Sequence, residues 1–142
     1  MGHIENSVHI NRPIDEVFAY VSDPSRMKEW NTDLVDAYVD GPVQLGARLT
    51  QVRSLLGQKI EATAEVTALD PPNSLSFASI GGGMINMMGS YLFEAMGEGT
   101  HFTLSVDIAP TGVLKIAEGA LVDNASKNMQ QNLAMLKQIL ES

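Results

Sequence analysis

The chain has 142 residues, of which 44% are hydrophobic and 18% charged, with a formal net charge of −8 and no cysteine. This length and apolar content predict a single globular domain over residues 1–142. The negative charge argues against nucleic acid and anionic membrane surfaces as partners, because they carry charge of the same sign. The lack of cysteine excludes disulfides, thiolate metal sites and a cysteine nucleophile.

Apolar stretches stop well short of the roughly 20 residues that a membrane-spanning helix needs. We therefore expect no integral membrane association. The first residues also lack the basic start, apolar run and small-residue cleavage site of a secretory signal. We expect a cytoplasmic location on this ground.

The N-terminal third predicts one strand followed by two short helices. Apolar and polar residues alternate over 4–10, as in a half-buried strand. Residues 13–21 are typical of a helix, because a proline in the first turn and two acidic residues after it favour a helix start. Asp23-Pro24 stops this helix, and Ser25 can cap a second short helix that ends at Asn31.

From Leu34 onward, turn residues separate about six further strands, which predicts an antiparallel meander. Residues 60–69 alternate most regularly, so one face of that strand is expected to be buried. The inward set there includes Ala62, Ala64 and Ala68. Their small side chains leave room for a ligand cavity.

After Gly112 the hydrophobic period becomes helical and continues to about Leu140. Leu121, Met129 and Leu136 share the apolar face of this expected long helix. The sheet and the helix are expected to bury each other. The predicted class is α+β.

Residues 10–30 carry a distinctive pattern: an isoleucine and a proline before the first helix, Val-Phe within it, Asp-Pro after it, and Trp30 six residues further on. Gly-Glu-Gly-Thr at 97–100 enters the last strand. Together with the element order, this pattern resembles the polyketide cyclase/dehydrase-like branch of the START/SRPBCC superfamily, over essentially the whole chain. The resemblance implies the helix-grip fold, a curved seven-stranded antiparallel sheet wrapped around a long C-terminal helix with a cavity between them. Its members include lipid and sterol carriers, hormone receptors and aromatic cyclases, so it implies no single reaction.

Three asparagines at four-residue spacing, Asn124, Asn128 and Asn132, lie within or at the edge of the apolar helix face. A buried amide without partners costs about 1–3 kcal/mol. One interpretation is therefore a polar stripe that binds a ligand or water in a cavity. The other, which we weigh slightly higher, is that the stripe meets solvent or backbone at the sheet edge.

Glu118 also falls on the apolar helix face, where a raised pKa would suit a general acid or base. A solvated carboxylate near the helix start is the favoured interpretation. Arg53 shares a strand phase with Leu49 and Gln51, and would be a cavity cation if that phase faced inward. The favoured placement for Arg53 is the surface.

Aromatic and methionine side chains complete the set of candidates. Tyr91 and Phe93 are expected to form cavity wall, with Tyr91 as a weak catalytic candidate, and Trp30 is expected to be a core anchor more than a ligand contact. Leu121 is expected to contact a ligand. Methionines are flexible gap fillers, and those at 84, 87, 88 and 96 suggest either a gate over the cavity, through Met87 and Met88, or a homodimer contact.

Three motifs that would indicate a particular chemistry are missing from the sequence: a phosphate-binding loop, a histidine metal site and a serine nucleophile elbow. The triple glycine at 81–83 is not followed by Lys-Ser/Thr, the histidines have no partners at metal-ligand spacing, and there is no Gly-x-Ser-x-Gly. We expect neither cofactor nor metal. The leading hypothesis is a protein that binds a hydrophobic or aromatic small molecule, lipid-like or polyketide-like. The alternatives are a polyketide aromatase/cyclase or dehydratase, and a dimerising regulatory protein.

Overall fold

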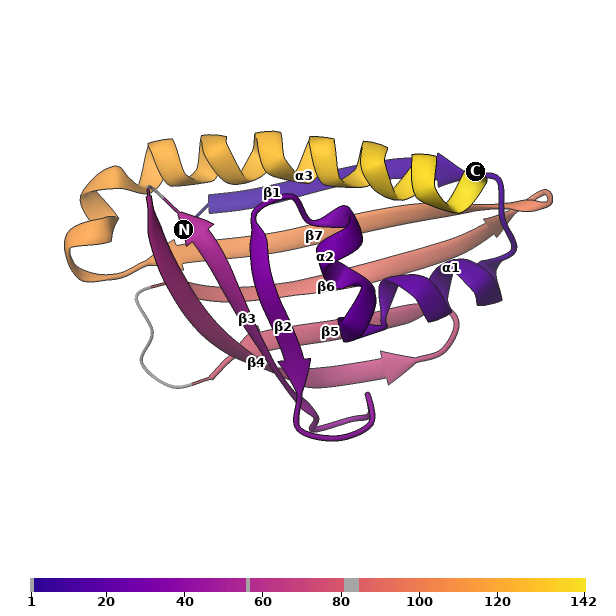
Figure 1. The fold of residues 1–142 in the computed structure, drawn as a ribbon, viewed down its shortest axis with the longest axis horizontal. Coiled ribbons are helices and arrows are strands. Elements are labelled where there is room, and N and C mark those ends of the chain that lie inside the picture. The colour runs from indigo at the N-terminus through magenta and orange to yellow at the C-terminus, as the bar shows by residue number, and fades with distance from the viewer. Residues whose placement is uncertain (1, 56, 81–84) are drawn as a thin grey trace.

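The computed structural model describes residues 2–55, 57–80 and 85–142, which form one seven-stranded antiparallel sheet around a long C-terminal helix (Figure 1). The spatial order is β1-β7-β6-β5-β4-β3-β2, so β2 to β7 form a meander and β1 pairs with β7. The strands are β1 (Gly2–Ile10), β2 (Leu34–Val39), β3 (Arg48–Leu55), β4 (Gln58–Asp70), β5 (Ser74–Ser79), β6 (Ile85–Met96) and β7 (Gly99–Pro110). The α+β class and the helix-grip architecture are confirmed.

The helical segments are α1 (Ile14–Val21), η1 (Pro24–Arg26), α2 (Met27–Trp30), η2 (Gly112–Ala117) and α3 (Glu118–Glu141), of which η1 and η2 are 3-10 helices. The expected continuous helix from Gly112 is wrong for its first six residues. The backbone of Ala117, with φ −96° and ψ 16°, leaves α-helical geometry and separates η2 from α3. The expected cap at Ser25 is also wrong, because the carboxylate of Asp23 caps η1 by accepting from the backbone N–H of Ser25 at 3.0 Å.

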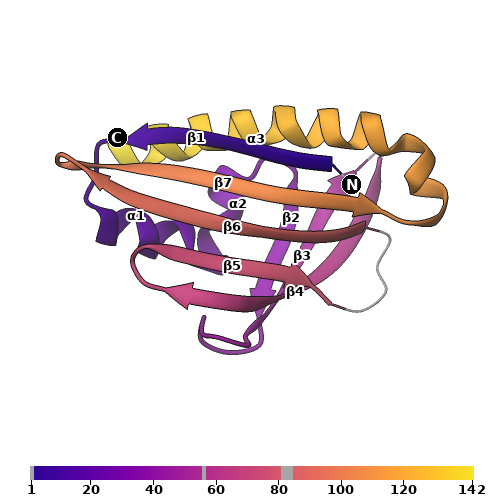
Figure 2. The same ribbon diagram turned by 180° about the vertical axis from the view of Figure 1, so that it is seen from behind.

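The end of the sheet beside α1 (Figure 2) contains a dense core, in which α1 packs on β6 and β7. Phe93 stacks on Phe102 with ring centroids 4.9 Å apart, and Phe18 of α1 meets Phe93 edge-on at 5.1 Å. Leu133 and Leu136 of α3 are buried in the same core. The C-terminal half of α3 is therefore held by close apolar packing.

The set of β4 side chains that points to the inner face of the sheet changes along the strand. Its pairing with β5 shifts register between Val66 and Ala68, which is a β-bulge with an extra residue on one strand. Val66 is buried, Ala68 is exposed, and Leu69 is half-buried, so the alternation reverses at the bulge. The expected inward position of Ala68 is therefore wrong.

Asn132 fixes α3 to the segment that follows α2. Its Oδ1 accepts hydrogen bonds from the backbone N–H of Thr32 at 3.0 Å and from the hydroxyl of Thr32 at 3.2 Å. Its Nδ2 donates to Oδ1 of Asn31 at 3.3 Å. This buried amide is thus satisfied by the protein itself.

The opposite side of α3 is attached to β1 and the turn after it. Nζ of Lys137 donates to the carbonyl oxygen of His9 at 2.6 Å. The carboxylate of Glu141 accepts from the backbone N–H of Asn11 at 2.8 Å and from Lys137 at 2.7 Å. The helix is therefore held on both sides along its C-terminal half.

Truncation of Leu136, which is 0% exposed, tests the packing of α3. We expect Leu136→Ala to lower the free energy of unfolding by about 2–5 kcal/mol, because it removes buried apolar contacts and leaves a cavity. Met135 is 37% exposed on the same helix, and Met135→Ala is the matched control with an expected effect within about 0.5 kcal/mol. Urea denaturation measures both, and a loss below about 0.5 kcal/mol for Leu136→Ala would contradict the packing described.

Substitution of Asn132 tests the attachment to Thr32. We expect Asn132→Leu to destabilise the protein by about 1–3 kcal/mol, because the N–H of Thr32 and the buried amide of Asn31 lose their partner. The neighbouring Gln131 is exposed, so Gln131→Leu is the control for the same change of side-chain type. Equal unfolding midpoints for the two variants would show that the attachment contributes nothing to stability.

Candidate ligand-binding cavity

A cavity of about 170 Å³ lies between the inner face of the sheet and the N-terminal half of α3. An engineered protein cavity of about 150 Å³ binds benzene, so this space is large enough for a small organic molecule. Most of its wall is apolar. The apolar lining residues are Ile4, Leu49, Ala62, Ala64, Phe77, Met87, Leu104, Val106, Ile108, Leu121, Ala125 and Met129, with Trp30 and Tyr91 beside them.

Small residues on neighbouring strands keep this space open. Ala64 of β4 stands opposite Ser79 of β5, and both line the cavity. Gly89 of β6 stands opposite Phe77 of β5. A Cβ atom at Gly89 would lie 2.6 Å from the carbonyl oxygen of Ser105 and 2.9 Å from the ring of Phe77. The absence of a side chain at Gly89 therefore lets the ring of Phe77 lie close against the sheet.

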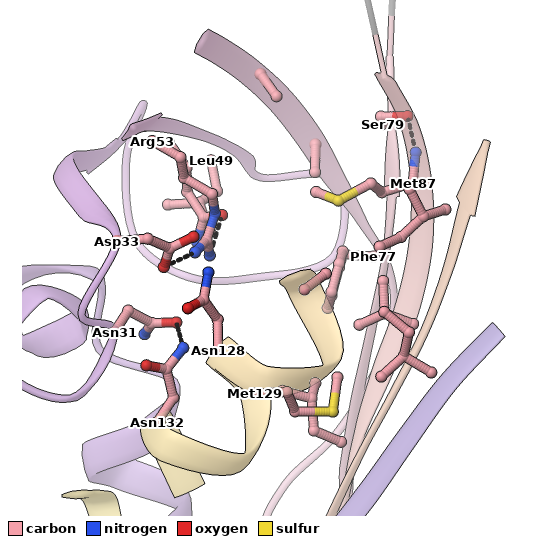
Figure 3. A pocket seen from close by; sticks show the side chains of 18 of the residues that line it. Asn31, Asp33, Leu49, Arg53, Phe77, Ser79, Met87, Asn128, Met129 and Asn132 are labelled. Carbon is pink, nitrogen blue, oxygen red and sulfur yellow. Dashed lines mark hydrogen bonds and ion pairs between the residues drawn. The ribbon is translucent and has the colours of Figure 1, made fainter. Parts of the chain in front are cut away.

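One end of the cavity is polar and contains an ion pair (Figure 3). Nη1 of Arg53 on β3 lies 2.8 Å from Oδ1 of Asp33, and Nη2 of Arg53 donates to Oε1 of Gln51 at 3.0 Å. The expected surface placement of Arg53 is wrong: the phase that contains Leu49, Gln51 and Arg53 faces the cavity. The sequence did not single out Asp33, because it lies in a short connection without a periodic pattern.

The three asparagines of α3 all line the cavity, but their surroundings differ. Asn132 is buried and bound to Thr32 and Asn31. Asn128 is half-buried, its amide points toward the Asp33–Arg53 pair in Figure 3, and its side chain hydrogen-bonds to no described residue. Asn124 is exposed at the edge. Asn128 is therefore the half-buried asparagine whose amide remains available to a ligand.

Tyr91 and Trp30 are cavity-lining aromatics with polar groups that no described residue satisfies. Burial raises the pKa of the Tyr91 hydroxyl, and the charge of Arg53 opposes this shift. Tyr91 therefore keeps its proton at neutral pH and remains a hydrogen-bond donor. Trp30 is 1% exposed, and its indole N–H has no acceptor among the described residues.

Leu121 and Met87, which are predicted from the sequence to contact a ligand, both line the cavity. Met88 does not, because successive side chains of a strand point to opposite faces, and it is 53% exposed. Phe93 is also absent from the lining, since it is stacked on Phe102 in the dense core. Met84 lies outside the described residues.

Glu118, the candidate acid or base, is partly exposed and is not among the described residues that line the cavity. Among residues 2–55, 57–80 and 85–142, no three acidic or histidine side chains are grouped so that they could hold a metal ion. In the same residues no helix is both long and apolar enough to cross a membrane.

Comparisons with known proteins concern the family and the fold of the chain. The family model for polyketide cyclase/dehydrase and lipid transport matches residues 1–141. TTHA0849 from Thermus thermophilus is 20% identical with a TM-score of 0.83, over 98% of this chain and 97% of that one. The Zhui aromatase/cyclase from Streptomyces sp. R1128 is 16% identical with a TM-score of 0.82, over 99% and 93%.

DR_A0006 from Deinococcus radiodurans is 20% identical with a TM-score of 0.71, over 99% of this chain and 98% of that one. At such identities the solved structures show the shared fold. No curated protein matches the chain significantly. The match of the family model over nearly the whole sequence shows that the chain belongs to the polyketide cyclase/dehydrase and lipid transport family.

Proposed function

We propose that the protein binds a small hydrophobic or aromatic molecule in the cavity between the sheet and α3. The observation that carries this proposal is the combination of an apolar wall with the unpartnered amide of Asn128 beside an ion pair at one end (Figure 3). The wall removes the apolar part of a ligand from water, which stabilises the complex by about 25 cal/mol per Å² buried. The amide of Asn128 then fixes the orientation of the ligand by a hydrogen bond to its polar group.

The volume limits the size of the ligand. About 170 Å³ is close to the cavity that holds benzene and below the roughly 300–1,000 Å³ of pockets for drug-sized ligands. A molecule enclosed in the cavity as it stands has about the size of a substituted single ring. Met87 and Met129, with their unbranched side chains, are the lining residues best able to move for a larger lipid-like or polyketide-like ligand.

An aromatase/cyclase or dehydratase is the second candidate function. It is favoured by the family description and by Tyr91 and Arg53, a proton donor and a cation that face one cavity. Such groups stabilise an enolate oxygen as negative charge develops on it. A regulatory protein that dimerises through its methionines remains a third hypothesis, in which exposed Met88 and Met96 supply the contact.

Asn128→Leu tests the binding proposal. We expect the affinity for a ligand with a polar group to fall by about 1–3 kcal/mol, because one hydrogen bond is lost. Stability is expected to stay equal or rise, since no described residue depends on the Asn128 amide. Calorimetric titration with the ligand that native mass spectrometry finds bound measures the first, and thermal unfolding the second. Unchanged affinity, or a loss of stability alone, would contradict the proposed role.

Glu118→Gln tests whether acid–base chemistry depends on this carboxylate. Because Glu118 lies outside the cavity lining, we expect neither ligand affinity nor any turnover of a polyketone substrate to change by more than about twofold. Tyr91→Phe is the comparison, since it removes the hydroxyl of a residue that does line the cavity. A large loss of turnover in Glu118→Gln with retained binding would restore Glu118 as a catalytic residue.

A further inference from the structure

Two charged side chains line the cavity in the described part of the chain, and they have opposite signs. Arg53 and Asp33 form an ion pair of 2.8 Å, and their side chains are 29% and 18% exposed. The polar end of the cavity therefore carries no net charge. The chain as a whole carries −8, so its overall charge disfavours the approach of an anion.

An anionic ligand gains little from this arrangement. A carboxylate that approaches Arg53 also approaches the carboxylate of Asp33, so attraction and repulsion largely cancel. The ligand still loses its hydration shell when it enters an apolar cavity. A fatty acid or aromatic acid is therefore a poor match, although an arginine faces the cavity.

A neutral hydroxyl group finds both kinds of partner at the same place. Asp33 has a second carboxylate oxygen that accepts from no described residue, so it can accept from the ligand hydroxyl. The amide of Asn128, which points toward this pair in Figure 3, can donate to the ligand oxygen. The guanidinium of Arg53 donates one N–H group to Asp33 and one to Gln51, and it carries further N–H groups besides these.

We infer that the cavity selects uncharged ligands that carry a hydroxyl group, phenols or alcohols, over carboxylates, and that Asp33 sets this selectivity by neutralising Arg53. This inference rests on the proposed binding function and names its ligand class. Asp33 is thus a specificity-determining residue that acts on the ligand directly and through the charge of Arg53.

Three probes of equal apolar size separate the possibilities: 4-ethylphenol, 4-ethylbenzoate and ethylbenzene, titrated calorimetrically at pH 7. At this pH the phenol is neutral, since a phenol has a pKa of about 10, and the benzoate is ionised. We expect the wild-type protein to bind 4-ethylphenol at least tenfold more tightly than 4-ethylbenzoate. Ethylbenzene reports the apolar contribution alone.

Asp33→Asn is the decisive variant, because it leaves the charge of Arg53 uncompensated in the cavity. We expect the affinity for 4-ethylbenzoate to rise at least tenfold while that for ethylbenzene stays within twofold. Asp36→Asn is the matched control, since Asp36 is an exposed carboxylate of β2 that does not line the cavity. We expect the Asp36→Asn protein to show the same selectivity among the three probes as the wild type.

Arg53→Gln provides the reciprocal test if Asp33→Asn fails to fold. It leaves Asp33 uncompensated, so 4-ethylbenzylamine, a cation, is expected to gain at least tenfold in affinity over wild type. Equal wild-type binding of the phenol and the benzoate, or an unchanged preference in both variants, would overturn the inference while the binding function stands. Failure of all three neutral and anionic probes to bind would overturn both.

Discussion

One α-helix is too narrow to cover a seven-stranded sheet, and the architecture of this protein follows from that mismatch. Strands lie about 4.8 Å apart, so seven of them measure about 29 Å across, whereas a helix with its side chains is about 10–12 Å wide. The sheet curves around α3, and α1 and α2 cover part of the inner face that α3 does not reach (Figures 1 and 2). The cavity lies between the curved sheet and the N-terminal half of α3, where the helix does not fill the space above the strands.

The two halves of α3 therefore have different tasks. Leu133 and Leu136 in the C-terminal half pack into the core, and Asn132 and Lys137 attach the helix on its two sides. The N-terminal half presents Leu121, Asn124, Ala125 and Asn128 to the cavity. An unfilled volume is tolerated on one half because close packing on the other half holds the helix in place.

The sequence predicts the fold well because its main signals are local. The element order, the two short helices and the inward phase of β1 all follow from periodicity and turn residues. The phase of β3 does not, because each of its two sets, one with Gln51 and Arg53 and one with Arg48 and Val52, mixes polar and apolar residues. The bulge after Val66 is likewise invisible in a pattern that continues to alternate.

The asparagines Asn124, Asn128 and Asn132 show, at the site, the same limit of prediction from the sequence pattern. Its four-residue spacing places Asn128 and Asn132 on one helix face, and both do line the cavity. Only the tertiary structure shows that Thr32 and Asn31 satisfy Asn132, while Asn128 points toward an ion pair whose acidic member, Asp33, is distant in sequence. Helical periodicity can assign a face, but the partner of each residue comes from elsewhere in the chain.

The small residues of the cavity wall have a consequence for how this chain could diverge. Ala62 and Ala64 face open space, so a larger side chain at either position would reshape the ligand site without moving the backbone. Gly89 offers no such freedom, because any Cβ atom there would meet the carbonyl oxygen of Ser105 in the next strand. Substitutions in β4 can therefore change the ligand preference in descendants of this protein. In β6, by contrast, Gly89 must be kept for β7 to lie beside it in the sheet.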